Sequence, residues 1–262
     1  MNLLRRFLRE HRRGLVGWSL GLAAVCFVYL PIYPSMAGPE LSRLMEQLPE
    51  ALLVAMGMTG PLDGAGYTHA SVFGLVGTLL MIMAAVSWGT RAVAGDEESG
   101  AMELTLAHPV TRTELVWQRA VGVALLTGAL ALAVTLSLLV LSRPSQLGLV
   151  TTNVLATGAA FWGLGLLHGW VALAAGALTG RRSVALGAAG GLAVAGYLAD
   201  AVGSQRVGLG WLGRLSPFDW AYGSEPLRHG LDASGLLLLG AVALLALVVA
   251  VWAFSRRDVG AG

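Results

Sequence analysis

Three residue patterns in the 262-residue sequence could carry chemistry, and the first suggests a serine nucleophile. Residues 17–21, Gly-Trp-Ser-Leu-Gly, match the G-x-S-x-G motif, in which a serine sits on a tight strand-to-helix turn. Such a serine also needs a histidine beside it, and His168 is the histidine inside an apolar stretch. Here Ser19 lies in an apolar run instead, and His168 could equally hydrogen-bond to a neighbouring helix. An intramembrane serine hydrolase that uses Ser19, or another serine, with His168 is one alternative function.

The second pattern is a single acid, Asp200, near the end of another apolar stretch. Ionisable groups inside a membrane are functional candidates because burying them there is costly. An ion-coupled secondary transporter that uses Asp200 is therefore another alternative. Such transporters more often carry several buried charges or broken helices, which this sequence does not clearly show. The histidines do not occur at metal-ligand spacing, so we expect no metal site.

The third pattern is the polar stretch 91–113, which holds the acidic run 96–98. Asp96 is placed to cap a short helix whose first turn carries the two glutamates, as the helix dipole favours. Pro109 would end that helix, and Thr111-Arg112-Thr113-Glu114 is a capping box that predicts the start of the next one. A simple connection needs only a few residues. A structured stretch of this length indicates docking onto a partner.

The elements that carry these residues are predicted to be membrane helices. The chain is 56% hydrophobic and 12% charged, about half the charge of a soluble domain. Charge-free windows supply the roughly 20 residues that cross the hydrocarbon core, although the shortest, 183–199, reaches that length only by running on past Asp200. The window 144–180 could be suspected of holding two spans, but two would need about 40 residues. We predict an all-α membrane protein, a single transmembrane domain over 1–262, with spans at 14–36, 67–90, 114–141, 150–179, 183–203 and 234–254.

Arginine placement predicts the orientation of this bundle. All seventeen basic residues are arginine, and an N-terminus inside puts twelve of them in the cytoplasm and five outside. This obeys the positive-inside rule and places both termini in the cytoplasm. Residues 2–13 predict an interfacial amphipathic helix on the inner leaflet, with a solvated flank as the alternative. The arginines that would face the lipid are Arg5, Arg6, Arg9, Arg12 and Arg13.

Two loops are predicted on the outer side, at 37–66 and 204–233. Leucine and methionine spacing over 41–52 predicts an amphipathic helix in the first. The second loop is rich in aromatic residues and proline, which suit an interfacial belt or an outer gate. Within the spans, Gly165–Gly169 and Gly187–Gly191 are G-x-x-x-G motifs that permit close helix contact. The candidate gate residues are Trp211, Pro217, Phe218 and Trp220.

Residues 94–112 resemble the coupling segment of type-2 ABC transporter permeases. The shared pattern is an acidic pair, a glycine, a Glu-Leu pair, and a proline followed by a small hydroxyl residue and an arginine. The segment lies between the second and third spans in that family, as it does here. The stretches 215–220 and 226–228 resemble the loop before the last span of antibiotic and multidrug exporters. One departure is Ala101-Met102, where the family more often has Thr-Leu.

The resemblance covers essentially the whole chain and implies a permease subunit of an ATP-driven exporter of amphiphilic substrates. Two permease halves, identical or paralogous, would each engage a separate nucleotide-binding ATPase. The chain has no lysine, and a P-loop requires one. We therefore expect no cofactor in this chain, with ATP and Mg on the partner. A bacterial cell membrane is the expected location, with membrane lipid and no nucleic acid among the partners.

The resemblance also implies which residues face the ATPase through the coupling segment, taken as 94–113. Glu97, Glu98, Glu103 and Arg112 are expected to make polar contacts with it, while Met102, Leu104 and Leu106 would seat the helix in its groove. The full set of expected coupling residues is Asp96, Glu97, Glu98, Gly100, Met102, Glu103, Leu104, Leu106, Pro109 and Arg112.

Overall fold

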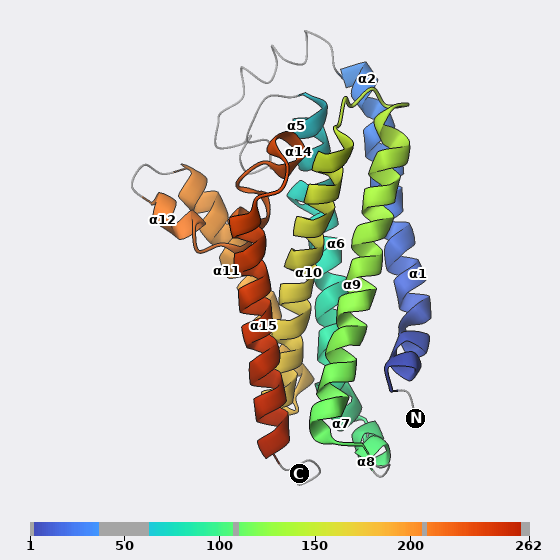
Figure 1. Ribbon diagram of the computed structural model, residues 1–262, viewed down its shortest axis with the longest axis vertical. Coiled ribbons are helices and arrows are strands. Elements are labelled where there is room, and N and C mark those ends of the chain that lie inside the picture. The colour runs from blue at the N-terminus through green and yellow to red at the C-terminus, as the bar shows by residue number, and fades with distance from the viewer. Residues whose placement is uncertain (1–2, 37–62, 107–109, 206–208, 258–262) are drawn as a thin grey trace.

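The computed structural model describes residues 3–36, 63–106, 110–205 and 209–257, which form helices and no strand. Six helical runs in this part of the chain are long and apolar enough to cross a membrane, so the prediction of an all-α six-span bundle is confirmed. Figure 1 shows them side by side along one axis. The runs are Leu3–Ser35, Gly64–Glu98, Arg112–Ser142, Thr151–Thr179, Arg182–Ser204 and Ala233–Arg256.

The last four long helices begin and end close to the predicted spans. The helical runs that contain the first two, Leu3–Ser35 and Gly64–Glu98, are longer than the spans predicted there. The helix predicted over 41–52 lies outside the described residues. The long helices are α1 (Leu3–Tyr29), α6 (Val76–Thr90), α9 (Arg112–Ser142), α10 (Thr151–Thr179), α11 (Arg182–Gln205) and α15 (Ala233–Arg256). The short elements are η1 (Leu30–Ile32), α2 (Tyr33–Met36), α5 (Gly64–Thr68), η2 (His69–Gly74), η3 (Arg91–Gly95), α7 (Asp96–Glu98), α8 (Ala101–Leu106), α12 (Gly210–Gly213), α13 (Pro217–Tyr222) and α14 (Pro226–His229).

The amphipathic N-terminal segment is the beginning of α1 and continues without a break into the first span. This differs from the separate interfacial helix that the sequence predicts. The reason is packing: Leu3 and Phe7 are buried against the bundle, and the Phe7 ring fills the space left by Gly122 of α9. The five predicted lipid-facing arginines are exposed on the opposite side, as an amphipathic helix requires.

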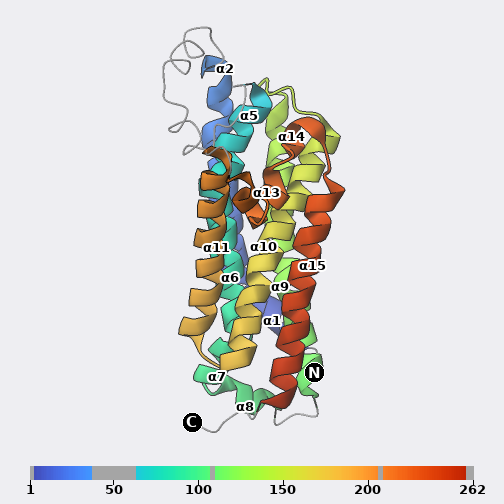
Figure 2. The same ribbon diagram turned by 90° about the vertical axis from the view of Figure 1, so that its left-hand side faces the viewer.

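Helix α10 is the centre of the bundle. It packs against α6, α9, α11 and α15, and Figure 2 shows it between these neighbours. Of its most apolar stretch, 78% is buried, compared with 17% for α1 and for α11. Helix α10 ends at Gly180, whose φ of +69° is the left-handed conformation that glycine commonly adopts at the C-terminus of a helix.

Glycine allows α6 and α10 to approach at backbone distance. A Cβ on Gly89 would overlap the carbonyl oxygen of Gly169, and a Cβ on Gly165 would lie 2.7 Å from the sulfur of Met81. The predicted close contact at Gly165–Gly169 is therefore confirmed. The expectation for Gly187–Gly191 is wrong within this chain, because a Cβ on either glycine would meet nothing within 4 Å.

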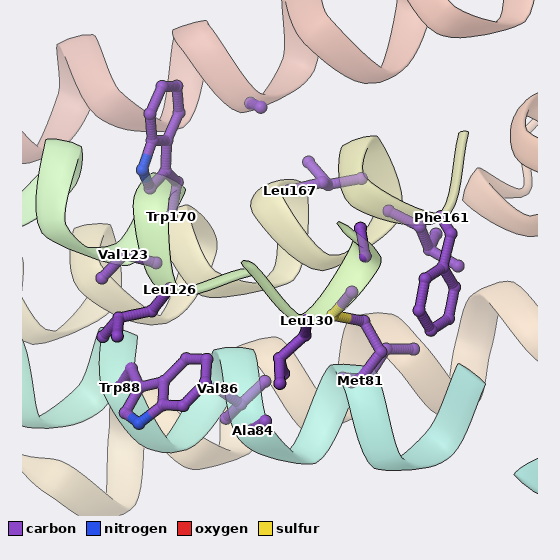
Figure 3. Packing of buried hydrophobic residues seen from close by; sticks show 14 of the residues in the cluster. Met81, Ala84, Val86, Trp88, Val123, Leu126, Leu130, Phe161, Leu167 and Trp170 are labelled. Carbon is purple, nitrogen blue, oxygen red and sulfur yellow. The ribbon is translucent and has the colours of Figure 1, made fainter. Parts of the chain in front are cut away.

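The core fills the space between α6, α9 and α10. Figure 3 shows Met81 and Trp88 of α6 near Leu126 and Leu130 of α9, with Trp170 of α10 close by. All five are buried. The indole N–H of Trp170 donates to a backbone carbonyl of α9 at 3.1 Å, which satisfies its polar atom in the apolar interior.

We predict that Gly89→Val disrupts the bundle, because its side chain must displace the Gly169 backbone. Overpacking of this kind typically costs about 1–3 kcal/mol or more. Gly191→Val is the matched control, since its added atoms enter open space. Thermal unfolding and size-exclusion profiles of the purified variants in detergent measure the effect. Equal stability of the two variants would contradict the close crossing.

Candidate functional site at the charged end of the bundle

The polar segment after the second span leaves the bundle as a continuous helical path. Helix α6 passes through the π-helix η3 into α7, so α7 has no free N-terminus. The prediction that Asp96 caps a new helix is wrong for this reason, and its carboxylate accepts a hydrogen bond from another helix instead. Gly100, with a φ of +73°, then makes the turn into α8. Glycine adopts this left-handed conformation without a steric penalty.

The third span begins where the capping motif predicts. Thr111 is the N-cap of α9, and its side chain accepts a hydrogen bond from the backbone N–H of Glu114 at 3.2 Å. Arg112, the first residue of α9, donates from its guanidinium to the carbonyl of Arg257. The start of the third span is therefore joined to the end of the sixth.

The three consecutive acids of α7 each pair with an arginine associated with a different span. We call Asp96, Glu97 and Glu98 the acidic anchor. Through it, one short helix is connected to three long ones. The pairs are Asp96 with Arg119 of α9, Glu97 with Arg257 just after α15, and Glu98 with Arg182 at the start of α11.

The pair between Asp96 and Arg119 is the most buried of the three. The Arg119 side chain is only 5% exposed, and its Nη2 lies 2.5 Å from a carboxylate oxygen of Asp96. The guanidinium also lies over the Phe7 ring, 5.1 Å from its centroid. A cation over an aromatic face is attracted to it. Arg119 thus joins α1, α7 and α9.

The pair between Glu97 and Arg257 sits against the end of α10. Both side chains are about one-fifth exposed. A Cβ on Gly180 would lie 2.7 Å from a guanidinium nitrogen of Arg257 and 2.8 Å from a carboxylate oxygen of Glu97. Only glycine leaves room for the pair here, so the helix end and the pair occupy one compact site.

The pair between Glu98 and Arg182 is the most exposed. The Glu98 carboxylate accepts from the backbone N–H of Arg182 at 2.7 Å, but the closest approach of its carboxylate to the guanidinium is 3.7 Å. Both side chains are more than 40% exposed. Solvated ion pairs contribute at most about 1 kcal/mol. The connection to α11 is therefore the weakest of the three.

The remaining predicted coupling residues follow in α8. Met102 is fully buried in the core of this chain, so it is not available to the partner groove that the sequence analysis assigned to it. Glu103 is exposed. Leu104 and Leu106 belong to the helix, but their side chains and all of Pro109 lie outside the described residues.

Sequence reasoning missed the arginines that hold the acidic anchor. Arg119, Arg182 and Arg257 entered only as positive charge on the cytoplasmic side. Arg119 did carry a signal, because it lies two turns inside an apolar helix, where an arginine needs an acidic partner. Nothing in the local sequence distinguishes an acid that pairs within the chain from one that faces a partner.

The four candidate gate residues lie at the opposite end and in different surroundings. Pro217 and Phe218 start α13 and are buried among α10, α11 and α15. The preceding Ser216 fixes them there, because its hydroxyl donates to a carbonyl of α11 at 2.8 Å. Trp211 is 58% exposed and Trp220 is partly exposed, as residues of an interfacial belt are. Their role as a gate stays a prediction.

A cavity of about 250 Å³ lies beside α13 at this end. Aromatic rings of Phe218 and Tyr222 line it together with the carboxyl groups of Asp200 and Asp219. Partial burial raises the pKa of Asp219 above its usual value, against the opposing influence of the Arg214 charge. The cavity therefore offers both apolar and anionic surface.

The two alternative chemistries find no support in the geometry. His168 donates from Nδ1 to the Leu164 carbonyl at 2.8 Å, and its ring packs near Phe218. No serine in the described ranges, Ser19 included, hydrogen-bonds to it. Asp200 lines the cavity beside α13, near Asp219. Among the described residues, no group of three potential metal ligands comes together.

A comparison with protein families decides what kind of protein carries this site. The model described as "ABC-2 family transporter protein" matches residues 1–259. The chain belongs to the ABC-2 family. The resemblance to type-2 ABC permeases is thereby confirmed. No curated protein matches the chain.

Membership defines the ABC-2 protein as a membrane subunit of an ABC transporter. It is a multi-pass membrane protein and the transport subunit, not itself the catalytic one. Membership also implies an ATPase partner. The assignment of residues 94–113 as a coupling segment stays a prediction.

We predict that the stability loss on breaking each anchor pair follows its burial. Arg119→Gln leaves Asp96 without its cation in a buried site, which we expect to cost about 2–4 kcal/mol. Arg182→Gln keeps the backbone hydrogen bond to Glu98 and should cost less than about 1 kcal/mol. Denaturant unfolding of the purified variants gives both values. Adding Asp96→Asn to Arg119→Gln should recover part of the loss, and equal losses for the two single variants would refute the burial order.

Proposed function

We propose that this ABC-2 protein is the permease of an ATP-driven exporter that moves an amphiphilic substrate, such as a drug, antibiotic or lipid-like molecule, out of a bacterial cell. It pairs with a second permease, a copy of itself or a paralogue, in the cell membrane. A separate ATPase chain binds ATP and Mg and drives each half. The observation that carries this proposal is the acidic anchor, which connects one segment to α9, α11 and α15.

The anchor gives the segment a mechanical role. A force applied to α7 and α8 is passed to three spans at once, because each acid holds a different helix. The burial of Met102 adds a fourth attachment, between α8 and the core. Closure of two ATPase subunits would thus move the ends of several spans together and not bend a loose loop.

This arrangement changes the roles we assign within the segment. Glu97 and Glu98 hold the segment to the bundle, and Arg112 joins α9 to the chain end. Glu103 is exposed and takes no part in the anchor. We therefore assign the polar contact with the ATPase to Glu103, and the transmission of movement to the anchor.

The cavity beside α13 supports the proposal that the substrate is amphiphilic. Its aromatic rings and carboxyl groups would suit a molecule with an apolar body and a polar group. Phe218 is a residue of α13 and lines this cavity. Movement of α13 would therefore change the shape of the cavity through which the substrate would leave. Export as the direction of transport follows the resemblance of 215–220 and 226–228 to exporters.

The first test measures assembly. We expect Glu103→Arg to weaken binding of the nucleotide-binding ATPase about tenfold. The substitution reverses the charge of the side chain at the proposed contact, so that it no longer complements the ATPase surface. Glu10→Arg, an exposed acid on α1, is the control and should leave binding unchanged. Co-purification and titration with the ATPase provide the measurement. A chain that never associates with any nucleotide-binding subunit would refute the proposal.

The second test measures coupling. We expect Glu97→Gln to keep the ATPase bound while reducing the ATP-driven movement of the outer end. A spin label at Leu231→Cys, an exposed site before α15, reports the distance between two permease copies. Replacing the buried Cys26 by serine removes the other thiol. Unchanged ATP-driven distance shifts in Glu97→Gln would show that the anchor does not transmit movement.

A further inference from the structure

Another group of ion pairs lies at the end of the bundle opposite the acidic anchor, where α14 meets α5 and α10 (Figure 1). Arg228 of α14 donates from Nη2 and Nε to the two carboxylate oxygens of Asp63, at 2.8 and 3.3 Å. The same guanidinium donates from Nη1 to the carboxylate of Glu225 at 2.6 Å. A bidentate pair fixes geometry as well as charge. We call Asp63, Glu225 and Arg228 the α14 clasp.

The clasp joins segments that belong to different spans. Asp63 is the N-cap of α5 at the start of the second helical run, where its side chain accepts a hydrogen bond from the backbone N–H of Gly66 at 2.8 Å. On the other side, the amide of Asn153 in α10 donates to the carbonyls of Leu227 and Arg228, at 3.1 and 2.8 Å. Helix α14 is therefore attached to the beginnings of both the second and the fourth spans.

Glu225 holds a backbone conformation that glutamate rarely adopts. Its φ of +51° and ψ of +63° lie in the left-handed region, which is uncommon for residues other than glycine. Pro226 follows it, and a proline favours extended backbone in the residue before it. Such a conformation is costly and persists only where the surrounding contacts impose it. Here the Glu225 carboxylate accepts from Arg228, and the Glu225 carbonyl accepts from the backbone N–H groups of Arg228 and His229 at 2.8 and 3.0 Å.

Both helices that the clasp joins are also held by other contacts. Leu227 of α14 is buried, and its carbonyl accepts from Asn153. A Cβ on Gly64 of α5 would overlap the carbonyl oxygen of Leu147, so α5 lies directly against the turn before α10. Loss of the ion pairs therefore leaves α5 and α14 attached to the bundle. The conformational change that follows such a loss falls on the strained residue, Glu225.

The ion pairs of the clasp reach solvent. The side chains of Asp63, Glu225 and Arg228 are 54%, 36% and 17% exposed. Partial burial raises the pKa of Asp63, but hydrogen bonds from Arg228 and Gly66 outweigh it and hold that pKa below its usual value. Asp63 is therefore charged at neutral pH, and the clasp is closed. Because water competes for exposed ion pairs, the clasp opens more easily than the buried contacts around it.

We propose that the α14 clasp is a conformational switch, in which release of Arg228 from Asp63 lets Glu225 leave its strained conformation while α14 stays attached to α10. Glu225 also lines the cavity beside α13, and it lies on the short connection between α13 and α14. Release of the clasp therefore changes the wall of that cavity. The switch is a property of this chain alone, and only its use in the passage of substrate rests on the proposed function.

Opening of the clasp is measured by hydrogen exchange of the purified chain without ATPase or ATP, so that failure here leaves the proposed function untouched. The N–H groups of residues 228 and 229 donate to the Glu225 carbonyl, so a peptide covering 226–230 reports the release. We expect Asp63→Asn, which keeps a capping side chain on α5, to speed this exchange about fivefold. Asp232→Asn, a helix cap outside the clasp, is the matched control and should leave the exchange unchanged.

Two substitutions of Glu225 separate a switch driven by strain from a merely structural ion pair. Both Glu225→Gln and Glu225→Gly remove the charge, but only glycine adopts the left-handed conformation without a steric penalty. We expect Glu225→Gln to exchange about as fast as Asp63→Asn, and Glu225→Gly to stay close to wild type. Unfolding temperatures confirm that each variant folds. Exchange in Glu225→Gly as fast as in Glu225→Gln would overturn the proposal.

The effect on the cavity is measured by labelling Ala201→Cys, a partly buried position in its wall, in a chain whose buried Cys26 is replaced by serine. We expect a neutral maleimide to react faster with this thiol when Asp63→Asn is added. Ser35→Cys, an exposed position outside the cavity, is the control and should react at the same rate in both backgrounds. Unchanged labelling of Ala201→Cys, or unchanged exchange in Asp63→Asn, refutes the switch.

Discussion

Backbone contact between α6 and α10 is the constraint on which the rest of the bundle depends. Inside a bilayer, association of helices gains little from the hydrophobic effect and relies on close packing. Gly89 and Gly169 supply it where the two backbones touch, and Gly176 brings η3 against the same helix through Ala94. The polar segment that follows α6 therefore starts in close contact with the most buried helix, α10. The acids of the anchor thus follow a helical path whose packing against α10 is close.

The three anchor pairs differ in strength, so the anchor holds some spans more firmly than others. The pair that Asp96 makes with α9 is buried, and the pair that Glu98 makes with α11 is solvated. Electrostatic attraction falls as water surrounds the charges. The anchor therefore holds α9 more firmly than α11. Helix α11, which also has one of the least buried apolar faces, is held most weakly.

The sequence was sufficient for the six spans because charge-free length is a direct consequence of the cost of burying charge in hydrocarbon. It also located the cap at Thr111 and the glycine contact at Gly165–Gly169, which depend on local spacing. It did not show that the acids of α7 pair inside the chain, since an acidic run looks the same whether its partner is internal or external. The sequence also could not show that Gly187–Gly191 differs from Gly165–Gly169. The two motifs have the same spacing, but Gly187 and Gly191 face open space in this chain.

Helix α11 is held by different contacts at its two ends. At the end near α13, the buried Ser216 hydroxyl donates to the Gly196 carbonyl. At the other end, the exposed Glu98 pair is the anchor's hold on the helix. The buried contact near α13 therefore holds α11 more firmly than the solvated pair at the end that carries the anchor.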